Sequence, residues 1–258
     1  MEIKLTCIIF SYDLELIIFG ETSKSKQVEN NMQFSACTIN VKHCKCFEKL
    51  TDAEKQFLEE HSVEILYKKG EVICKQGGFA SHIMLVVSGL AKVYIESPSN
   101  SLVLKIIPDG NFIGMASVSE ERPTYQYSAV TYIDSIIRQI DLKAFNQLLD
   151  QNPGFAREVI EILTTNSLQI YGRFFCLTQK QAYGRLADII LCLSDRIFKE
   201  SEFNLPLSRK DLAELSGMSQ ETVIRMLNKF ISEGLIQMER KRFKVLDYTR
   251  LKQISDKG

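Results

Sequence analysis

The hydrophobic positions between residues 51 and 140 follow a short period after one initial helix. The helix is predicted from Thr51 to about His61, because Thr51 and Glu54 have the spacing of a capping box. Short segments follow that are rich in β-branched and aromatic residues and are mostly separated by Gly, Pro, Asn or Asp, a pattern typical of strands joined by turns. The predicted strands are Val63–Tyr67, Glu71–Lys75, Ile83–Val87, Leu90–Glu96, Leu102–Ile107, Tyr127–Tyr132 and Ser135–Ile140. Many short strands at this spacing predict a β-sandwich or jelly roll.

From residue 141 the hydrophobic period lengthens to that of helices. A short helix is predicted over Asp141–Asp150, and Asn152-Pro153 begins a long helix that continues to about Thr178. Six residues of the long helix recur at spacings of three and four: Ile160, Leu163, Ser167, Ile170, Phe174 and Leu177. Such a stripe is typical of a coiled-coil seam. It can pack on the β domain of its own chain or form a dimer interface, and the length of the helix favours the dimer interface.

The segment after residue 184 has the steric pattern of a helix-turn-helix. An amphipathic helix over Arg185–Phe198 precedes a second helix, which Ser208 is expected to cap. Ala213 is small enough for two helices to cross closely, and Gly217, four residues later, can adopt the positive φ of a helix-ending turn. Val223, six residues further, is expected to face back onto the second helix. An ordinary helical hairpin is the alternative interpretation.

The helix after this turn carries side chains that can read bases. Ser219 can cap it, and its first two turns then project Gln220, Glu221 and Arg225. Arg225 can donate two hydrogen bonds to guanine, Glu221 can accept from cytosine, and Gln220 can pair with adenine. Ser219 and Thr222 are expected to contact phosphate, which positions the helix without reading sequence. The alternative is that Glu221 and Arg225 form an ordinary surface ion pair.

Residues Gln237–Leu246 predict a β-hairpin with a basic tip, Arg240-Lys241-Arg242. Such a tip would contact the DNA backbone as a wing, and the alternative is a solvated turn. The predicted DNA-contacting residues are therefore Ser208, Ser219, Gln220, Glu221, Thr222, Arg225, Arg240, Lys241 and Arg242.

Composition and charge agree with a DNA-binding domain joined to a domain of another kind. The chain of 258 residues has 45% apolar residues, 25% charged residues and a formal net charge of zero, which suits a globular protein of two modest domains. Residues 180–258 carry 15 Lys and Arg against 11 Asp and Glu, so this part is basic and the rest is acidic. Seven cysteines without a disulfide-framework spacing indicate a reducing cytoplasm. No segment predicts a membrane span.

A β jelly roll, a long helix and a winged helix, in this order, resemble the cyclic-AMP receptor / fumarate-nitrate regulator (Crp/Fnr) family of bacterial transcription factors. The resemblance runs from about Phe47 to about Leu246. Its motifs are Gly70-Glu71-Val72-Ile73, Gln76-Gly77, Val87-Ser88-Gly89, Gly110-Asn111-Phe112-Ile113-Gly114, Pro206-Leu207-Ser208-Arg209 and Gly217-Met218-Ser219-Gln220-Glu221-Thr222-Val223. The resemblance implies an α+β fold with a cyclic-nucleotide-binding-like sensor domain. It also implies a homodimer that binds near-palindromic duplex DNA, with RNA polymerase as a further partner.

On this basis we expect four segments along the chain. Residues 1–31 form an N-terminal extension without a clear period, and one hypothesis is that the natural protein begins at Met32. Residues 32–152 hold a cysteine-containing segment and the β jelly-roll sensor domain. Residues 153–179 form the dimerisation helix, and residues 180–258 form the winged helix-turn-helix domain.

The residues at the family's effector pocket differ from those of its cyclic-AMP binders. The phosphate cassette of those binders combines Gly-Glu with Arg-Ser, and the matching positions here are Gly114-Met115 and Tyr127-Ser128. The adenine-contacting Thr-Ser pair falls on Ile170-Tyr171. A methionine cannot accept a hydrogen bond from a ribose as a carboxylate does, and a tyrosine has no positive charge for a phosphate. The resemblance therefore implies an effector other than cyclic AMP.

The oxygen-sensing branch of the family holds an iron–sulfur cluster with N-terminal cysteines and one cysteine of the β domain. Cys37, Cys44 and Cys46 suggest such an arrangement. The usual fourth position is Ser135, and Cys74 and His43 are the candidates to replace it. Three alternatives stay open for these cysteines: a zinc site, a thiol-oxidation switch, or small buried thiols without such a role.

A function of another class is also open. The chain could be a small-molecule-binding or protein-docking module whose winged helix meets a protein instead of DNA. Salt-dependent, sequence-preferring binding to duplexes distinguishes the two classes. An enzyme is not predicted, because the three histidines have no triad or metal-hydrolase spacing and no Gly-rich phosphate loop precedes a helix.

Overall fold

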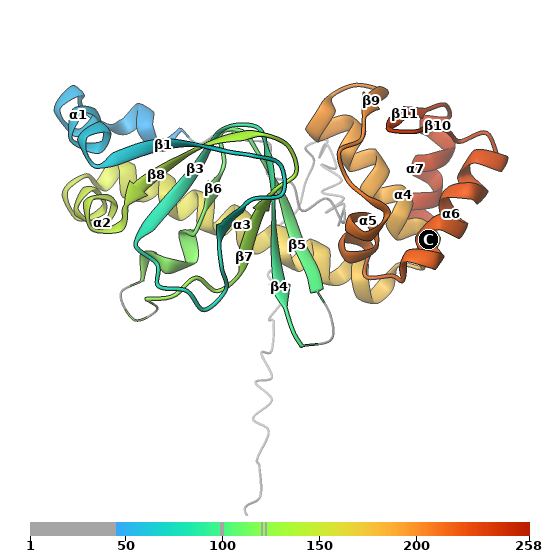
Figure 1. Ribbon diagram of the computed structural model, residues 1–258, viewed down its shortest axis with the longest axis horizontal. Helices are drawn as coiled ribbons and strands as arrows, with labels where there is room; N and C mark the ends of the chain where they lie inside the picture. Colours follow the sequence, from blue (N-terminus) through green and yellow to red (C-terminus); the bar gives the residue numbers. More distant parts are fainter. Residues whose placement is uncertain (1–44, 99–100, 120, 122) are drawn as a thin grey trace, which may run out of the picture. The chain divides into compact units, whose positions relative to one another are not determined.

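The computed structural model describes residues 45–98, 101–119, 121 and 123–258. Its β domain consists of two antiparallel four-stranded sheets, with the strand orders β1-β8-β3-β6 and β2-β7-β4-β5 (Figure 1). The strands are β1 (Ser62–Tyr67), β2 (Val72–Cys74), β3 (His82–Ser88), β4 (Leu90–Glu96), β5 (Ser101–Pro108), β6 (Phe112–Ile113), β7 (Ser128–Thr131) and β8 (Ser135–Asp141). This arrangement confirms the predicted β jelly roll, and β6 is the strand that the sequence pattern did not predict.

The space between the two sheets holds the core of the β domain. The side chains that meet there are almost completely buried: Val86, Ala91, Val93, Ala129 and Ile137. Ala91 and Val93 of β4 are two residues apart and both point inward, because the pleat turns alternate residues to opposite faces of a strand. The β3–β4 turn brings two strands very close, since a Cβ on Gly89, which has φ 115, would lie 2.2 Å from Ser135 Oγ. Only glycine fits there, which explains the Val87-Ser88-Gly89 motif.

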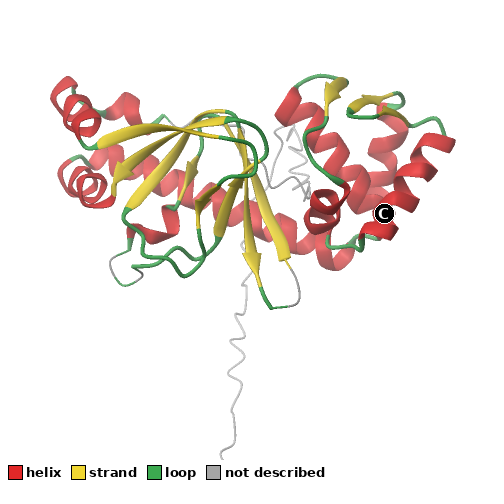
Figure 2. Cartoon of the chain, viewed as in Figure 1, coloured by secondary structure: helices red, strands yellow, loops and turns green. Residues whose placement is uncertain are grey.

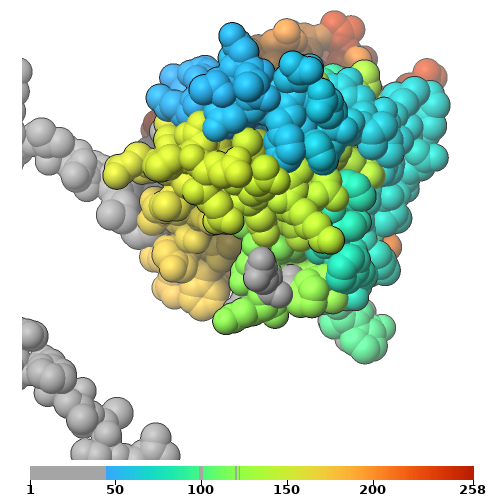
Figure 3. Space-filling view, turned by 90° about the vertical axis from the view of Figure 1, so that its left-hand side faces the viewer, coloured from blue at the N-terminus to red at the C-terminus, as the bar shows by residue number. Residues whose placement is uncertain are grey.

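Three helices close one end of the β domain. They are the 3₁₀-helix η1 (Cys46–Lys49), α1 (Asp52–Glu60) and α2 (Leu142–Gln151), and they lie side by side in Figure 3, coloured blue and yellow-green. The predicted capping box of α1 is present, with Thr51 N–H donating to Glu54 Oε2 at 2.7 Å. Beneath the helices, Phe145 packs edge-on against Phe112 and Phe155 at ring distances of 6.0 and 5.2 Å.

The long helix α3 (Pro153–Gln179) has two different faces. It begins as predicted, with Pro153 in its first turn and Asn152 Oδ1 accepting from Phe155 N–H at 2.9 Å. One face is buried: Phe155, Val159 and Arg173 turn to the β domain, whereas the Cys176 thiol donates to Asp188 of the C-terminal domain at 3.6 Å. The opposite face carries most of the predicted stripe and is open: Ile160 is 60%, Ile170 58% and Phe174 68% exposed. The stripe therefore does not pack on the β domain of its own chain.

The inner face of α3 covers a lysine of β5 that has no acidic partner among the described residues. Lys105 Nζ donates to Asn166 Oδ1 at 2.9 Å, and burial lowers the pKa of Lys105 to about 8. As the pH rises, the Lys105 ammonium group therefore loses its proton earlier in the folded chain than in the unfolded chain. Between about pH 8 and 10 the unfolded state binds more protons, so this group makes the stability rise with pH there.

Lys105→Met is expected to raise the free energy of unfolding at pH 7 by about 1–3 kcal/mol, because it removes a desolvated charge while keeping the apolar stem. Denaturant unfolding at pH 7 and pH 9.5 tests this. The gain should shrink at the higher pH, where the folded wild type has already lost the proton. An equal gain at both pH values would show that packing and not charge is responsible.

The C-terminal domain is helical with a small sheet (Figure 2). Its elements are α4 (Ala182–Cys192), the π-helix η3 (Leu193–Phe198), β9 (Glu202–Asn204), α5 (Arg209–Ser216), α6 (Gln220–Ser232), β10 (Ile236–Glu239), β11 (Arg242–Val245) and α7 (Tyr248–Lys257). The helix predicted over Arg185–Phe198 thus starts earlier and changes to a π-helix before Lys199, which has φ 54. The strand β9, which joins the predicted hairpin in the order β10-β11-β9, and the helix α7, which packs on α4, were not predicted.

Candidate nucleic-acid interface

The helix α5 begins as the sequence predicts, at a capping box. Ser208 Oγ accepts a hydrogen bond from Asp211 N–H at 3.1 Å, and the Asp211 carboxylate accepts from Ser208 N–H at 2.8 Å. Two backbone donors at the start of α5 are therefore satisfied by side chains. The cap fixes where α5 starts and thereby sets its position ahead of the turn.

The turn between α5 and α6 has the geometry of a helix-turn-helix. Gly217 ends α5 with φ 64, and Met218 N–H donates to Ala213 O at 3.0 Å. Val223 is completely buried and Ala213 nearly so, which places the two helices in close contact. A Cβ on Gly217 would lie 3.0 Å from the Leu177 side chain, so α3 also packs against this turn. The expected roles of Ala213, Gly217 and Val223 are all found.

The first turns of α6 present the predicted base-reading residues to solvent. Ser219 Oγ accepts from Thr222 N–H at 3.2 Å and so caps the helix. Gln220, Glu221 and Arg225 are exposed, because the burial of Val223 turns the opposite side of the helix outward. Hydrogen bonds from its own backbone N–H and from Ser219 lower the pKa of Glu221, so this carboxylate is charged at neutral pH.

The alternative interpretation was that Glu221 and Arg225 form an ordinary surface ion pair with each other. The described residues contain no ion pair between these two side chains. Asn228 lies on the same exposed side of α6, one turn beyond Arg225. Asn228 is not among the DNA-contacting residues predicted from the sequence. The helical period of three to four residues from Arg225 could have found it.

The hairpin β10–β11 forms the expected wing, but its basic tip is only partly available. Arg240 and Lys241 are exposed at the turn, and Arg240 has φ 54. Arg242 instead forms an ion pair with Glu202 of β9, which also accepts from Lys244 at 3.3 Å. The Arg242 side chain remains 70% exposed in this ion pair, so its predicted contact with the DNA backbone stays a prediction.

The residues predicted for an effector pocket are only partly brought together. Gly114 N–H donates to Tyr127 Oη at 2.8 Å, so the tyrosine side chain reaches the turn that contains Gly114. Met115 is buried among the aromatic residues under α2. Ser128 Oγ accepts from Gln76 N–H at 3.0 Å. Ile170 and Tyr171 lie on the open face of α3, and no hydrogen bond among the described residues joins them to Gly114 or Tyr127.

The proposed metal ligands do not converge in the described part of the chain. Cys37, His43 and Cys44 lie outside the described residues. Cys46 is buried in the hydrophobic cluster under α2, whereas Cys74 belongs to the separate cluster between the sheets. Burial raises the pKa of Cys74 to about 12, so without a bound metal it is a thiol. Cys46 and Cys74 therefore do not fit a shared metal site in this structure.

A β jelly roll that is linked through a long helix to a winged helix-turn-helix defines a DNA-binding transcriptional regulator with a sensor domain. Two family models match the chain: a cyclic nucleotide-binding domain over residues 64–152 and a Crp-like helix-turn-helix domain over residues 184–254. Together these ranges cover more than half of the chain. The chain belongs to the Crp/Fnr family of transcription regulators, whose members bind DNA through the helix-turn-helix and typically act as dimers.

Curated relatives and solved structures agree with this family. The chain is 26% identical over 189 residues to the transcriptional activator protein anr of Pseudomonas aeruginosa, covering 71% of this chain and 77% of that protein. It is 22% identical over 245 residues to the fumarate and nitrate reduction regulatory protein of Escherichia coli, covering 89% and 96%. The structure of FixK2 from Bradyrhizobium japonicum matches with a TM-score of 0.70 at 21% identity, covering 76% of this chain and 98% of that chain.

No helix in the described ranges combines the length and the hydrophobicity that crossing a bilayer requires.

Proposed function

We propose that this chain is a homodimeric regulator whose two α6 helices read the half-sites of a near-palindromic duplex. The observation that carries the proposal is the leading end of α6. Gln220 and Arg225 are exposed, and their side chains have no hydrogen-bond partner among the described residues. Their side chains therefore need to break no contact within the described protein before they bind base edges in a major groove.

The residues around α6 divide into base-reading and positioning groups. Arg225 suits guanine, and Glu221 suits cytosine because its lowered pKa keeps it an acceptor. Thr222 and the wing residues Arg240 and Lys241 suit phosphates, which fix the register of the helix in the groove. Ser219 Oγ accepts from a backbone N–H at the start of α6, and its O–H can turn to a phosphate. The Ser208 hydroxyl donates to Asp211 Oδ2 at 2.6 Å, so it contacts a phosphate as a donor only if this bond breaks.

The exposed stripe of α3 supports a dimer through this helix. Apolar side chains of this size are rarely left open in a row on a monomer. The spacing of three and four matches a two-helix seam, in which each stripe buries the other. A dimer with two-fold symmetry explains why the DNA site should be a near-palindrome, with half-sites about one helical turn apart.

We infer that the effector of the β domain is not cyclic AMP. Tyr127 supports this, because its hydroxyl occupies the backbone N–H of Gly114, a donor that a phosphate would otherwise use. Met115, which stands where cyclic-AMP binders have a carboxylate, is buried in an apolar cluster. Equilibrium dialysis with cyclic AMP should show no saturable binding.

We place the protein in the cytoplasm, with RNA polymerase as its further partner, and both placements rest on analogy to the family.

Selection of bound duplexes from a random pool, with and without air, tests the proposal as a whole. We expect enrichment of a near-palindrome whose affinity falls linearly with the logarithm of salt concentration. Enrichment of single half-sites would contradict the dimer. No enrichment under either condition would contradict DNA reading and favour a protein-docking role of the winged helix.

A further inference from the structure

A groove lies between the β domain and the C-terminal domain, beside the β3–β4 turn. Its β-domain wall includes Gly89, Leu90 and Ile133, and its other wall includes Phe198 and Pro206. The volume of the groove is about 360 Å³, which lies in the range of small-molecule sites, and such sites occur preferentially at domain interfaces. None of its lining residues belongs to the effector pocket predicted from the sequence.

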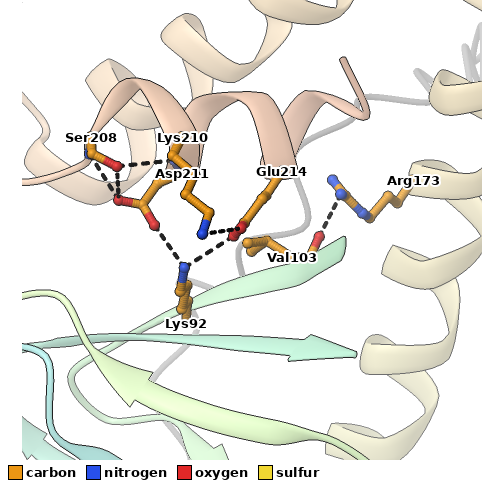
Figure 4. Close-up of polar contacts among 7 residues, drawn as sticks. All are labelled: Lys92, Val103, Arg173, Ser208, Lys210, Asp211 and Glu214. Carbon is orange, nitrogen blue, oxygen red and sulfur yellow. Dashed lines mark hydrogen bonds and ion pairs between the residues drawn. The ribbon is translucent and has the colours of Figure 1, made fainter. Parts of the chain in front are cut away.

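The two walls of the groove are joined by a shared core and by buried charges. Leu90 and Leu205 line the groove from its two walls and belong to one hydrophobic cluster. Further along β4, Lys92 donates from Nζ to Asp211 and Glu214 of α5, at 2.7 and 3.1 Å (Figure 4). The contacts that form the groove are therefore the same contacts that join the two domains.

Both walls of the groove present apolar side chains that are not fully covered. Ile133, in the loop before β8, is 38% exposed. Across the groove, Ile197 and Phe198 of η3 are half-buried. An apolar body between these walls would remove apolar surface of both domains from water, and such burial is the main favourable contribution to association. The shape and the lining therefore favour an occupant with an apolar body.

Two exposed lysines that line the groove give it a positive charge. Lys69 follows β1 and Lys241 lies at the wing turn, and neither forms an ion pair among the described residues. Asp134, next to the groove, is already paired with Lys68 at 3.0 Å. Among the described lining residues Asp109 is the only acid, so two lysines against one aspartate leave a net charge of +1. This charge favours an occupant that carries one negative charge.

We propose that the groove binds a small carboxylic acid with an apolar body. The body lies against Ile133 and Phe198, and Lys69 and Lys241 attract the carboxylate. Because Lys241 is also a predicted phosphate contact, a bound carboxylate and a DNA backbone would compete for it. The proposal goes beyond the proposed function and does not rest on it, since the groove holds its ligand whether or not α6 reads DNA.

Titration of the full chain with hexanoate, octanoate and decanoate tests the site in the absence of DNA. Isothermal calorimetry should show saturable binding of one molecule per chain at concentrations up to about 10 mM. The affinity should rise about fourfold for each methylene group that the ligand gains and the groove covers. Octylammonium has the same apolar body as octanoate and the opposite charge, so it should bind more weakly.

Ile133→Glu tests where the carboxylate binds. The change replaces an apolar contact with a like charge, so the affinity for octanoate should fall by more than about tenfold. Ile95→Glu is the matched control, because Ile95 of β4 is 40% exposed and does not line the groove. It should bind octanoate as the wild type does. Circular dichroism should show the wild-type fold in both variants.

Lys69→Gln tests the charge without changing the apolar walls. An exposed ion pair contributes little, so octanoate should bind about 2–5-fold more weakly, whereas the binding of octanol should not change. Lys143→Gln is the control, since Lys143 is an exposed lysine of α2 outside the groove. It should leave the affinity for both ligands unchanged.

Three results would overturn the proposal. They are the absence of saturable carboxylate binding, octylammonium binding as tight as that of octanoate, and equal octanoate binding by Ile133→Glu and Ile95→Glu. The third result would show that the ligand is held elsewhere, with the exposed stripe of α3 as the other apolar surface. None of these results bears on DNA reading, because the variants leave α6 and the wing unchanged and the titrations contain no DNA.

Discussion

Phe174→Asp is expected to convert the protein to a monomer and to weaken its binding to a two-half-site duplex by about 10²–10⁴-fold. Phe174 is 68% exposed on α3, so the change costs the folded monomer little. In a dimer built on the stripe, the same change places two carboxylates in an apolar seam, where they cannot be solvated. The loss of affinity follows because a monomer binds only one half-site, without the gain from a linked second site. Sedimentation equilibrium and titration of the selected duplex measure the two effects.

Phe174→Leu is the control for this experiment, because it keeps an apolar side chain of similar reach in the stripe. It should remain a dimer and retain affinity for the full site. Circular dichroism should show the helical content of the wild type in both variants. If Phe174→Asp stays dimeric at the concentrations used for DNA binding, then the stripe is not the dimer interface and another surface must bring the two α6 helices together.

The sequence predicted well those elements whose signals lie within a few neighbouring residues. The capping boxes at Thr51 and Ser208 are present because an acid at the third position is always within reach of its serine or threonine. The long helix begins after Asn152 for the same kind of reason. The steric demands of the helix-turn-helix are equally local, since Ala213 and Val223 are only ten residues apart and must meet.

Elements that depend on distant partners were missed. The strand β6 has two residues and exists because Phe112 and Ile113 pair with β3. The strand β9 exists because β11 offers it an open edge. The helix α7 has a largely polar sequence, and it is held in place by the burial of Leu251 and Ser255. No short-range pattern marks such segments, because their stability comes from tertiary contacts.

The functional residues also divide into those with a local signal in the sequence and those that depend on distant partners. The outward direction of Gln220, Glu221 and Arg225 follows from the period of one helix. The partners of charged residues do not, because Arg242 and Glu202 are 40 residues apart and Lys92 and Asp211 are 119 residues apart. A basic residue at a hairpin tip or on a strand therefore cannot be assigned to DNA or to the protein from its position in the sequence alone.

Arg225→Ala is expected to weaken binding to the selected duplex by about 1–3 kcal/mol per half-site and to relax the preference at one base pair of each. Arg225 is exposed and forms no ion pair within the described residues, so its removal leaves no buried acid unpaired. The loss therefore reports the interaction with DNA and not a change of fold. Its size follows from the two parallel hydrogen bonds that a guanidinium can donate to guanine O6 and N7. Binding curves on the selected duplex and on duplexes changed at single positions measure both effects.

Two further variants separate base reading from attraction to the backbone. Arg225→Lys keeps the charge and loses the planar fork, so it should retain affinity for random DNA and still lose discrimination at the same base pair. Lys241→Ala removes a wing charge and should weaken binding to all duplexes alike, with the salt slope reduced by about one for each phosphate that the wing no longer neutralises. If Arg225→Ala instead lowers affinity equally for selected and random duplexes, then Arg225 binds phosphate, and the base-reading role passes to Gln220, Glu221 and Asn228 on the same exposed side of α6.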